Sequence, residues 1–408
     1  MGKAMRTRNA RRQMQGILCR LLVLSVTVIP SPQFNPMQAA EPPDSDNALY
    51  QLDSRFTRLA IGLDRINPIV HLNDGSLLEL KGDPKYGTIT RDDGKTWTSL
   101  GHVYDGPGPG RYTYGGLALQ TRSGAIVIAY PDEENARWSW DKEREEASEA
   151  SRDVWVARSL DGGRTWVDRH RAFEGCAGDL RQMIETSDGH LVLPITRWTH
   201  DPGRWTVCTY VSTDDGKTWN RSNIIDLGGH GDHDGVTEPT LVELKDHRLL
   251  MMMRTNWDRF WEAYSWDGGW SWREIRPSGI PASTSPGYMI RLSSGRLVFA
   301  WNPLAPGDNP RPLHRFKASP IAPIWKHASQ HPADWYRHSL CLAFSDDEGQ
   351  TWSEPIVFCR KRKGHGEALL YPIILEREPG MLWIIVRPLV LSVRESDLVD
   401  GDSNGKRR

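Results

Sequence analysis

Five copies of one short motif constrain this chain of 408 residues more than any other feature. The motif reads Ser/Thr-x-Asp-x-Gly-x-Thr/Ser-Trp, and its copies lie at residues 90–97, 159–166, 212–219, 265–272 and 345–352. In such a turn the Asp side chain can accept backbone N–H groups, the Gly supplies a positive φ, and the Trp can fill the space between two sheets. One copy would be weak evidence, but five copies predict five equivalent hairpins.

A second repeat runs in phase with this motif. Each unit has an apolar strand, a turn at a Gly or a His, and a second apolar strand. The six units are 68–80 around Gly75, 117–130 around Gly124, 183–195 around Gly189, 240–253 around His247, 289–301 around Gly295 and 372–386 around Gly380. Repeats of about 40–50 residues that each form four strands are typical of β-propellers. We therefore predict an all-β chain that folds as a six-bladed β-propeller of four-stranded antiparallel blades.

The first forty residues have the composition of a secretory signal peptide. They carry six basic residues and no acidic residue, and an apolar run at 21–29 is followed by small residues before an acidic stretch. The apolar run is shorter than the roughly 20 residues that span a bilayer, so a retained membrane anchor is the less favoured alternative. We predict that residues 1–40 are the signal, that the mature protein is secreted or periplasmic, and that it has no stable membrane span.

The rest of the chain is expected to form one propeller domain over residues 41–394, followed by a polar, disordered tail at 395–408. The sixth repeat unit is not followed by a motif, so we expect residues 50–62 to supply its outer strand and to close the ring. Two segments, 131–153 and 302–335, fall outside the repeat. Each can be a rim over a site or a solvated insertion, and the first can contain a short helix.

Charge and cysteine spacing exclude several classes of function. The whole chain has a formal charge of −1, and its basic leader makes the remainder acidic, which disfavours a nucleic-acid partner. No CxxC spacing occurs, which argues against a zinc site, and Cys208 and Cys341 are expected to be buried thiols. The segment 230–234 has metal-ligand residue types, but we expect a solvated loop there. No cofactor is implied.

The repeat also predicts which side chains meet. In a propeller the first strand of each blade lies beside the central channel, so residues at the same phase reach the same opening. Counting nine positions back from the turn residue gives Glu238 and Tyr371 as equivalents, two blades apart. The ends of the second and third strands return to the same face. Together these phases gather six residues around one opening: Arg65, Asp83, Glu238, Arg254, Arg337 and Tyr371. Arg181, Arg197 and Arg204 either line the same opening or pair with acidic residues.

The chemistry of this set favours an acidic ligand. Several guanidinium groups that converge on one place indicate a carboxylate, which they can bind bidentately. A carboxylate nucleophile would be repelled by such a ligand, whereas Tyr371 is neutral, although its ordinary pKa of about 10 means that it needs a base. Glu238 is the candidate base and Asp83 the candidate acid, with Asp132 as its rival. Each residue also has an ordinary structural alternative, such as a turn cap or a surface ion pair.

With these residues the chain resembles the sialidase (neuraminidase) superfamily of six-bladed propellers with Asp-box, or BNR, repeats, over roughly residues 65–386. Glu238-Pro239 and Arg254 resemble the segment that carries the catalytic Glu and the second Arg, and Arg337 resembles the third Arg. Tyr371 resembles the nucleophile, Arg65 the first Arg and Asp83 the acid/base. The resemblance implies an exo-α-sialidase that hydrolyses sialylated or other acidic glycans with retention, through a tyrosyl glycoside.

Two departures from the family pattern keep other functions open. Arg387 stands where many members have a Glu that supports the first Arg, and Tyr371 is followed by Pro372 rather than by a small polar residue. One alternative is therefore a glycosidase or lyase for another acidic sugar, such as a uronate in a polysaccharide. The other is a non-catalytic carbohydrate-binding propeller.

Overall fold

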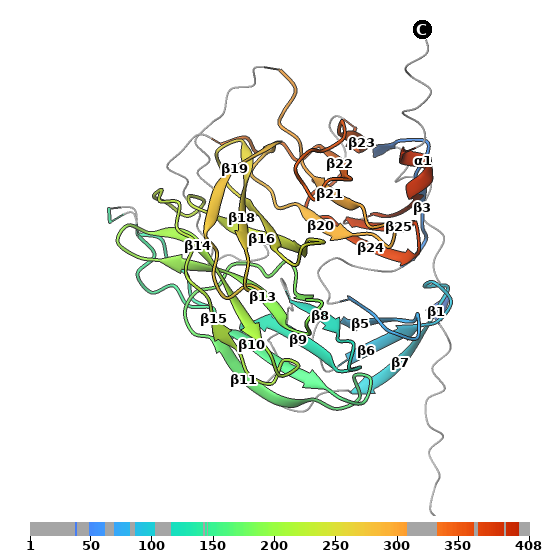
Figure 1. Cartoon of the computed structure of the whole chain (residues 1–408), viewed down its shortest axis with the longest axis horizontal. Coiled ribbons are helices and arrows are strands. Elements are labelled where there is room, and N and C mark those ends of the chain that lie inside the picture. Colours follow the sequence, from blue (N-terminus) through green and yellow to red (C-terminus); the bar gives the residue numbers. More distant parts are fainter. Residues whose placement is uncertain are drawn as a thin grey trace, which may run out of the picture. The chain divides into compact units, whose positions relative to one another are not determined.

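The computed structural model describes residues 37–38, 49–61, 69–81, 86–102, 116–141, 143–144, 146–307, 333–362, 366–386 and 389–399. Six antiparallel sheets follow one another along this part of the chain (Figure 1). Strands of neighbouring blades contact each other, for example β13 (Leu191–Thr199) with β16 (Thr237–Glu243), and β16 with β20 (Tyr288–Arg291). The predicted all-β, six-bladed propeller is confirmed.

The first three blades are built from consecutive strands. The first blade contains β4 (Ile69–His71), β5 (Leu77–Lys81), β6 (Tyr86–Thr90) and β7 (Thr96–His102), with β1 (Met37–Gln38) added at its edge. The second contains β8 (Leu117–Gln120), β9 (Ile126–Pro131), β10 (Val154–Ser159) and β11 (Val167–Phe173). The third contains β12 (Ile184–Glu185), β13, β14 (Arg204–Ser212) and β15 (Asn220–Arg221).

The last three blades complete the ring. The fourth contains β16, β17 (Leu249–Arg254), β18 (Arg259–Ser265) and β19 (Glu274–Pro281). The fifth contains β20, β21 (Leu297–Trp301), β22 (Ser339–Ser345) and β23 (Ile356–Lys361), with β2 (Tyr50–Leu52) at its edge. The sixth contains β24 (Ile373–Glu378), β25 (Met381–Val386), β26 (Leu389–Arg394) and β3 (Thr57–Arg58).

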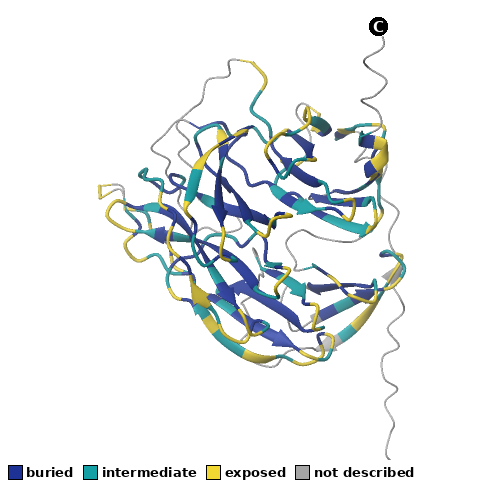
Figure 2. Cartoon of the chain, in the orientation of Figure 1, coloured by how far each residue is buried: buried dark blue, intermediate teal, exposed yellow. Residues whose placement is uncertain are grey.

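The phase of the repeat is visible in the backbone. The six turn residues on which the units were aligned all have a positive φ: Gly75, Gly124, Gly189, His247, Gly295 and Gly380. The second strand of a blade lies between two neighbours and is buried along its length in β9 and β17, whereas the outer strand β11 is exposed or half-buried up to its last residue (Figure 2). Continuous apolar runs therefore form inner strands, and polar strands form the outer surface.

The five motifs form the predicted turns. In the fourth, Asp267 accepts hydrogen bonds from the backbone N–H of Ser271 at 2.8 Å, from the Ser271 hydroxyl at 2.5 Å and from the Ser265 hydroxyl at 2.8 Å. Gly269 has a φ of 93°, and a Cβ at this position would lie 2.9 Å from Val192 of the preceding blade. The motif thus needs Asp for its acceptors and Gly both for its backbone and for its close contact.

Each motif Trp packs where two blades meet. Trp272 is 2% exposed and lies in a cluster with Val192 of the third blade and Met251 of the fourth. The other four motif tryptophans pack in the same way against clusters that join consecutive blades: Trp97, Trp166, Trp219 and Trp352. The predicted filling of the inter-blade space by these side chains is confirmed.

Ring closure follows the prediction in part. Strand β3 pairs with β26 through Thr57 and Arg58, so residues within 50–62 do supply the outer strand of the sixth blade. The preceding residues of this segment, β2, pair instead with β23 and add a fifth strand to the fifth blade. An apolar cluster joins Leu77 of the first blade to Trp383 and Ile385 of the sixth. The segment that contains β2 and β3 therefore pairs with two neighbouring blades, the fifth and the sixth.

Three segments outside the repeat units differ from the sequence-based expectation. Residues 395–399 are not a disordered tail, because they form α1 (Glu395–Val399), in which Leu398 is 3% exposed and Glu395 accepts a hydrogen bond from Arg296. Met37 and Gln38, inside the predicted signal, pair with β7. The described part of 131–153 contains no helix. Its backbone instead forms isolated β-bridges, such as the one between Arg137 and Ser151.

The 230–234 segment is not a solvated loop. Asp232 is 2% exposed and Asp234 is fully buried. The Asp234 carboxylate accepts hydrogen bonds from the backbone N–H of His230 at 3.0 Å and from the Asn256 side chain. These polar groups are buried because they bond to the chain around them rather than to water.

The motif carboxylates predict an acid limit to stability. Hydrogen bonds from Thr96 lower the pKa of Asp92 to about 2, and hydrogen bonds from Thr165 and Ser159 outweigh burial and lower the pKa of Asp161 to about 2. A lowered carboxyl pKa stabilises the fold above the unfolded pKa of about 3.9, and this stabilisation is lost as the pH falls through the folded value. We expect the melting temperature, followed by circular dichroism, to fall between about pH 4 and pH 2. Asp161→Asn should flatten this dependence, whereas Glu149→Gln at an exposed site should leave it unchanged.

Candidate active site

Glu238 and Arg254 form a buried ion pair at one end of the fourth blade. Glu238 lies near the start of β16 and Arg254 ends β17, and each is 6% exposed. The Arg254 Nη1 donates to Glu238 Oε2, and Arg254 Nε donates to Thr284 Oγ1 at 3.1 Å. The β16–β17 register is irregular between Thr237 and Thr240, which is the local distortion that places Glu238.

Tyr371, at the start of the sixth blade, contacts both members of this ion pair. It lies just before β24 and is hydrogen-bonded to both Glu238 and Arg254. Burial works against the charged form of Glu238, but the Arg254 charge, the hydrogen bond from Tyr371 and the Arg181 charge hold the pKa of Glu238 below its ordinary value. Burial also opposes the charge of Arg254, yet Glu238 and Tyr371 raise the pKa of Arg254. Glu238 is therefore an ionised carboxylate beside a phenol.

The backbone is strained at both of these residues. Glu238 has a φ of 44° and Tyr371 a φ of 59°, in the left-handed region that side chains other than Gly rarely adopt. Each is followed by a proline, Pro239 or Pro372, and each lies nine positions before its turn residue. Strain of this kind costs roughly 1–3 kcal/mol per residue and is concentrated at functional sites. The positive φ distinguishes Glu238 and Tyr371 from the other described non-glycine residues at or next to the first strands of the blades.

Arg337 reaches the same cluster from the fifth blade. Its Nη2 donates to the Thr284 carbonyl at 2.9 Å, and its Cζ lies 5.9 Å from the centre of the Tyr371 ring. Thr284 therefore binds both Arg254, through its hydroxyl, and Arg337, through its carbonyl. Arg337 is partly exposed, whereas Arg254 is buried with two of its donor positions engaged by Glu238 and Thr284.

Arg181 is the cluster member that the sequence left open. It precedes β12 in the third blade, yet its Nη2 donates to the Pro372 carbonyl at 2.9 Å and its Cζ lies 4.9 Å from the Tyr371 ring centre. The signal in the sequence was its position, eight residues before Gly189 and one residue out of phase with Glu238 and Tyr371. Arg204 instead pairs with Asp226, and the Arg197 guanidinium lies 6.0 Å from the Phe173 ring.

The structure therefore brings together four of the six predicted site residues, Glu238, Arg254, Arg337 and Tyr371. Arg65 and Asp83 lie outside the described residues, as does Arg387, so their roles stay predictions. The rival acid Asp132 accepts hydrogen bonds from the backbone N–H of Asn135 at 3.1 Å and from its side chain at 3.0 Å. This pattern is that of a carboxylate that caps its own turn.

The described residues contain buried thiols but no cluster of metal ligands. Across the described ranges no three His, Cys, Asp or Glu side chains gather as a metal site. Cys176, Cys208, Cys341 and Cys359 are buried free thiols, as expected for Cys208 and Cys341, and burial raises the pKa of Cys208 to about 11. Within the same ranges no helix is long and apolar enough to cross a membrane.

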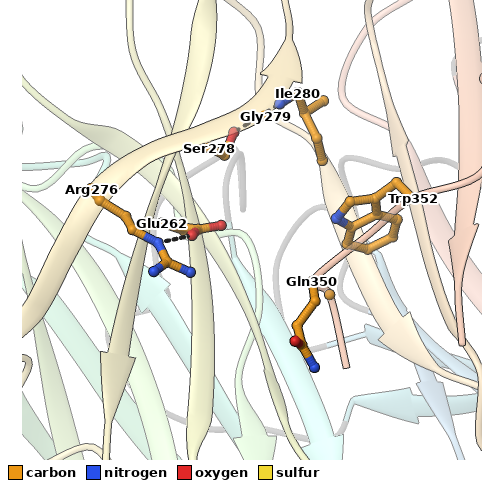
Figure 3. Close-up of a pocket in the computed structure, with 8 residues that line it drawn as sticks. Glu262, Arg276, Ser278, Gly279, Ile280, Gln350 and Trp352 are labelled. Atoms are coloured by element: carbon orange, nitrogen blue, oxygen red, sulfur yellow. Dashed lines mark hydrogen bonds and ion pairs between the residues drawn. The ribbon is translucent and has the colours of Figure 1, made fainter. Parts of the chain in front are cut away.

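A pocket of about 240 Å³ opens between the fourth and fifth blades (Figure 3). It is lined by Glu262 and Arg276, which form an ion pair, by the β19 segment Ser278–Ile280, and by Gln350 and Trp352 of the fifth motif. None of these residues belongs to the cluster around Tyr371. The pocket therefore does not contribute to the chemistry of that cluster.

Comparisons with known proteins agree with this architecture. The profile described as a BNR repeat-like domain matches residues 84–384. No curated protein matches the chain. Among solved structures, a protein of unknown function from Dyadobacter fermentans is 16% identical, with a TM-score of 0.53, over 85% of this chain and 98% of its own.

Two enzymes share the same architecture. The K499G mutant of the NanB sialidase from Streptococcus pneumoniae is 12% identical over 87% of this chain and 73% of its own, with a TM-score of 0.51. An α-L-arabinanase from Penicillium chrysogenum, complexed with arabinobiose, is 12% identical over 86% of this chain and 98% of its own, with a TM-score of 0.50. At these identities the likeness is one of fold.

Proposed function

Because the chain belongs to the BNR repeat-like domain family, we propose that it is a retaining exo-glycoside hydrolase that releases terminal sialic acid, or a related acidic sugar, from glycans. One observation carries the proposal. The hydroxyl of Tyr371 is hydrogen-bonded to a buried, ionised carboxylate, Glu238. Three arginines lie beside this pair, one from each of the third, fourth and fifth blades: Arg181, Arg254 and Arg337. A phenol in this setting has both a base for its proton and cations for its charge.

The arginines support an acidic substrate in this proposal. A sugar carboxylate can be bound by guanidinium groups through short, charge-assisted bonds. Arg254 already donates to Glu238 and Thr284, so the partly exposed Arg337, together with Arg65, is proposed to bind the substrate carboxylate and Arg254 mainly to hold the Tyr–Glu pair. A neutral nucleophile suits such a substrate, because a carboxylate nucleophile would meet like charge.

The proposed reaction proceeds in two balanced steps. In the first, the Tyr371 oxygen attacks the anomeric carbon as its proton passes to Glu238, and the departing glycosidic oxygen takes a proton from Asp83. In the second, Asp83 removes a proton from water, whose oxygen attacks the anomeric carbon as the bond from that carbon to the Tyr371 oxygen breaks, and the released Tyr371 oxygen takes back its proton from Glu238. Two inversions give net retention, as in retaining glycosidases that use a tyrosine.

A pair of fluorogenic substrates tests the proposal. We expect the protein to release the fluorophore from an aryl α-sialoside, with the α-anomer of the free sugar appearing first by NMR. Cleavage of an aryl uronide without cleavage of the sialoside would move the substrate to another acidic sugar while keeping the same chemistry. Binding of an acidic glycan without release of either fluorophore would replace the enzyme with a carbohydrate-binding propeller.

A further inference from the structure

We propose that Arg181 is a positioning residue for Tyr371: it fixes the Pro372–Ile373 peptide, one residue beyond Tyr371, and supplies positive charge against the phenol ring. The inference rests on the proposed function of Tyr371 as the nucleophile. Nothing in the repeat assigns this role to Arg181, because it belongs to the third blade and Tyr371 precedes the sixth.

The contacts of Arg181 join these two blades directly. Its Nη2 donates to the Pro372 carbonyl at 2.9 Å across 191 residues of chain. The same guanidinium lies with its Cζ 4.9 Å from the centre of the Tyr371 ring, within the range of a cation–π contact. The hydrogen bond therefore holds the carbonyl of the residue that follows the strained Tyr371, and the charge faces the Tyr371 side chain.

Arg181 is itself held by its neighbour in the chain. The Gln182 side chain accepts hydrogen bonds from Thr240 Oγ1 at 2.5 Å and from the Leu241 N–H at 2.8 Å, and it donates to the Met289 carbonyl at 2.9 Å. These bonds anchor the loop before β12 to the fourth and fifth blades. The position of Arg181 over Tyr371 is consequently set by the scaffold rather than by a flexible surface side chain.

Within the part of the chain that the structure describes, Arg181 forms no ion pair with an acidic side chain. Its buried Nε has no hydrogen-bond partner in that part either. Among the described residues, Glu238 and Arg254 from the fourth blade and Arg337 from the fifth also act on or lie against Tyr371. The Tyr288 ring centre lies 6.0 Å from the Arg181 Cζ. Glu238 favours the neutral phenol, and the three arginines favour the phenolate. Arg181 thus helps to offset the carboxylate on which the phenol depends as its base.

Direct titration of the phenol tests this role without an activity assay. The ultraviolet difference spectrum between the wild-type protein and Tyr371→Phe reports ionisation of Tyr371 alone. Arg181→Met, measured in the same way against its own Tyr371→Phe double variant, is expected to raise the ionisation midpoint by about one pH unit or more, because a cation near the ring is lost. Arg181→Lys, which keeps the charge but not the planar fork, should raise it by less than half as much.

The controls separate this role from a purely structural one. Arg197→Met removes an arginine of the same blade that lies by Phe173 and should not move the midpoint. Arg181→Gln repeats the test with an uncharged side chain that can still donate to Pro372, should Arg181→Met fold poorly. An unchanged midpoint in the uncharged variants would overturn the inference. A raised midpoint in a protein that cleaves no acidic glycoside would keep the inference and remove the proposed function instead.

Discussion

Tyr371→Phe is expected to lower kcat/KM by roughly 10³-fold or more on whichever acidic glycoside the protein cleaves, while the fold stays intact. The change removes one oxygen, which is the atom proposed to attack the anomeric carbon. The ring itself remains, so its contacts with the Arg181 and Arg337 guanidiniums are kept. Initial rates over a range of substrate concentrations, with a melting curve of each protein, measure both parts of the expectation.

The matched control is Tyr210→Phe. Tyr210 lies on β14, partly buried, and its ring packs edge-on against Phe173 at a centroid distance of 6.4 Å, away from the cluster. Its loss of a hydroxyl should change kcat/KM by less than about threefold. If Tyr371→Phe kept more than about a tenth of the wild-type rate, Tyr371 would not be the nucleophile. The other members of the cluster would then have to be reconsidered as a binding site.

The sequence predicted the parts of this fold that depend on local chemistry. A motif turn is determined by an Asp acceptor, a Gly with positive φ and a Trp within eight residues, so each copy can be found from its own letters. The position of Glu238 opposite Tyr371 followed from phase alone, because equivalent residues of first strands reach the same opening. The strand from 57–58 that closes the sixth blade followed from the missing element.

The sequence could not predict contacts that are made across the ring. The role of Arg181 depends on a long side chain that spans two blades, and a residue one position out of phase has no reason to be chosen over Arg197 or Arg204. Burial of Asp232 and Asp234 depends on partners such as Asn256, 22 residues away from Asp234. The polar letters of Glu395–Val399 concealed a helix that docks through Leu398. Such features depend on tertiary partners, which a local pattern does not contain.

Trp272→Ala is expected to lower the free energy of unfolding by roughly 3–5 kcal/mol, the cost of truncating a large aromatic in a core that cannot close over the cavity. Trp272 is buried between the third and fourth blades, and its Nε1 donates to Thr209 Oγ1 at 2.8 Å. Equilibrium unfolding in urea, followed by circular dichroism so that the lost fluorophore does not matter, gives the difference in free energy.

Trp266→Ala is the internal control, because this Trp belongs to the same motif but is 54% exposed. It should cost less than about 1 kcal/mol, since an exposed side chain leaves no cavity and loses only surface contacts, such as those with Arg248 and the Tyr264 ring. Equal effects of the two changes would mean that Trp272 does not join the blades. The difference also bears on the site, because Glu238 donates its backbone N–H to Thr196 Oγ1 at 2.7 Å across this same blade interface. A weakened interface should therefore disturb Glu238, the proposed base beside Tyr371, before the rest of the propeller unfolds.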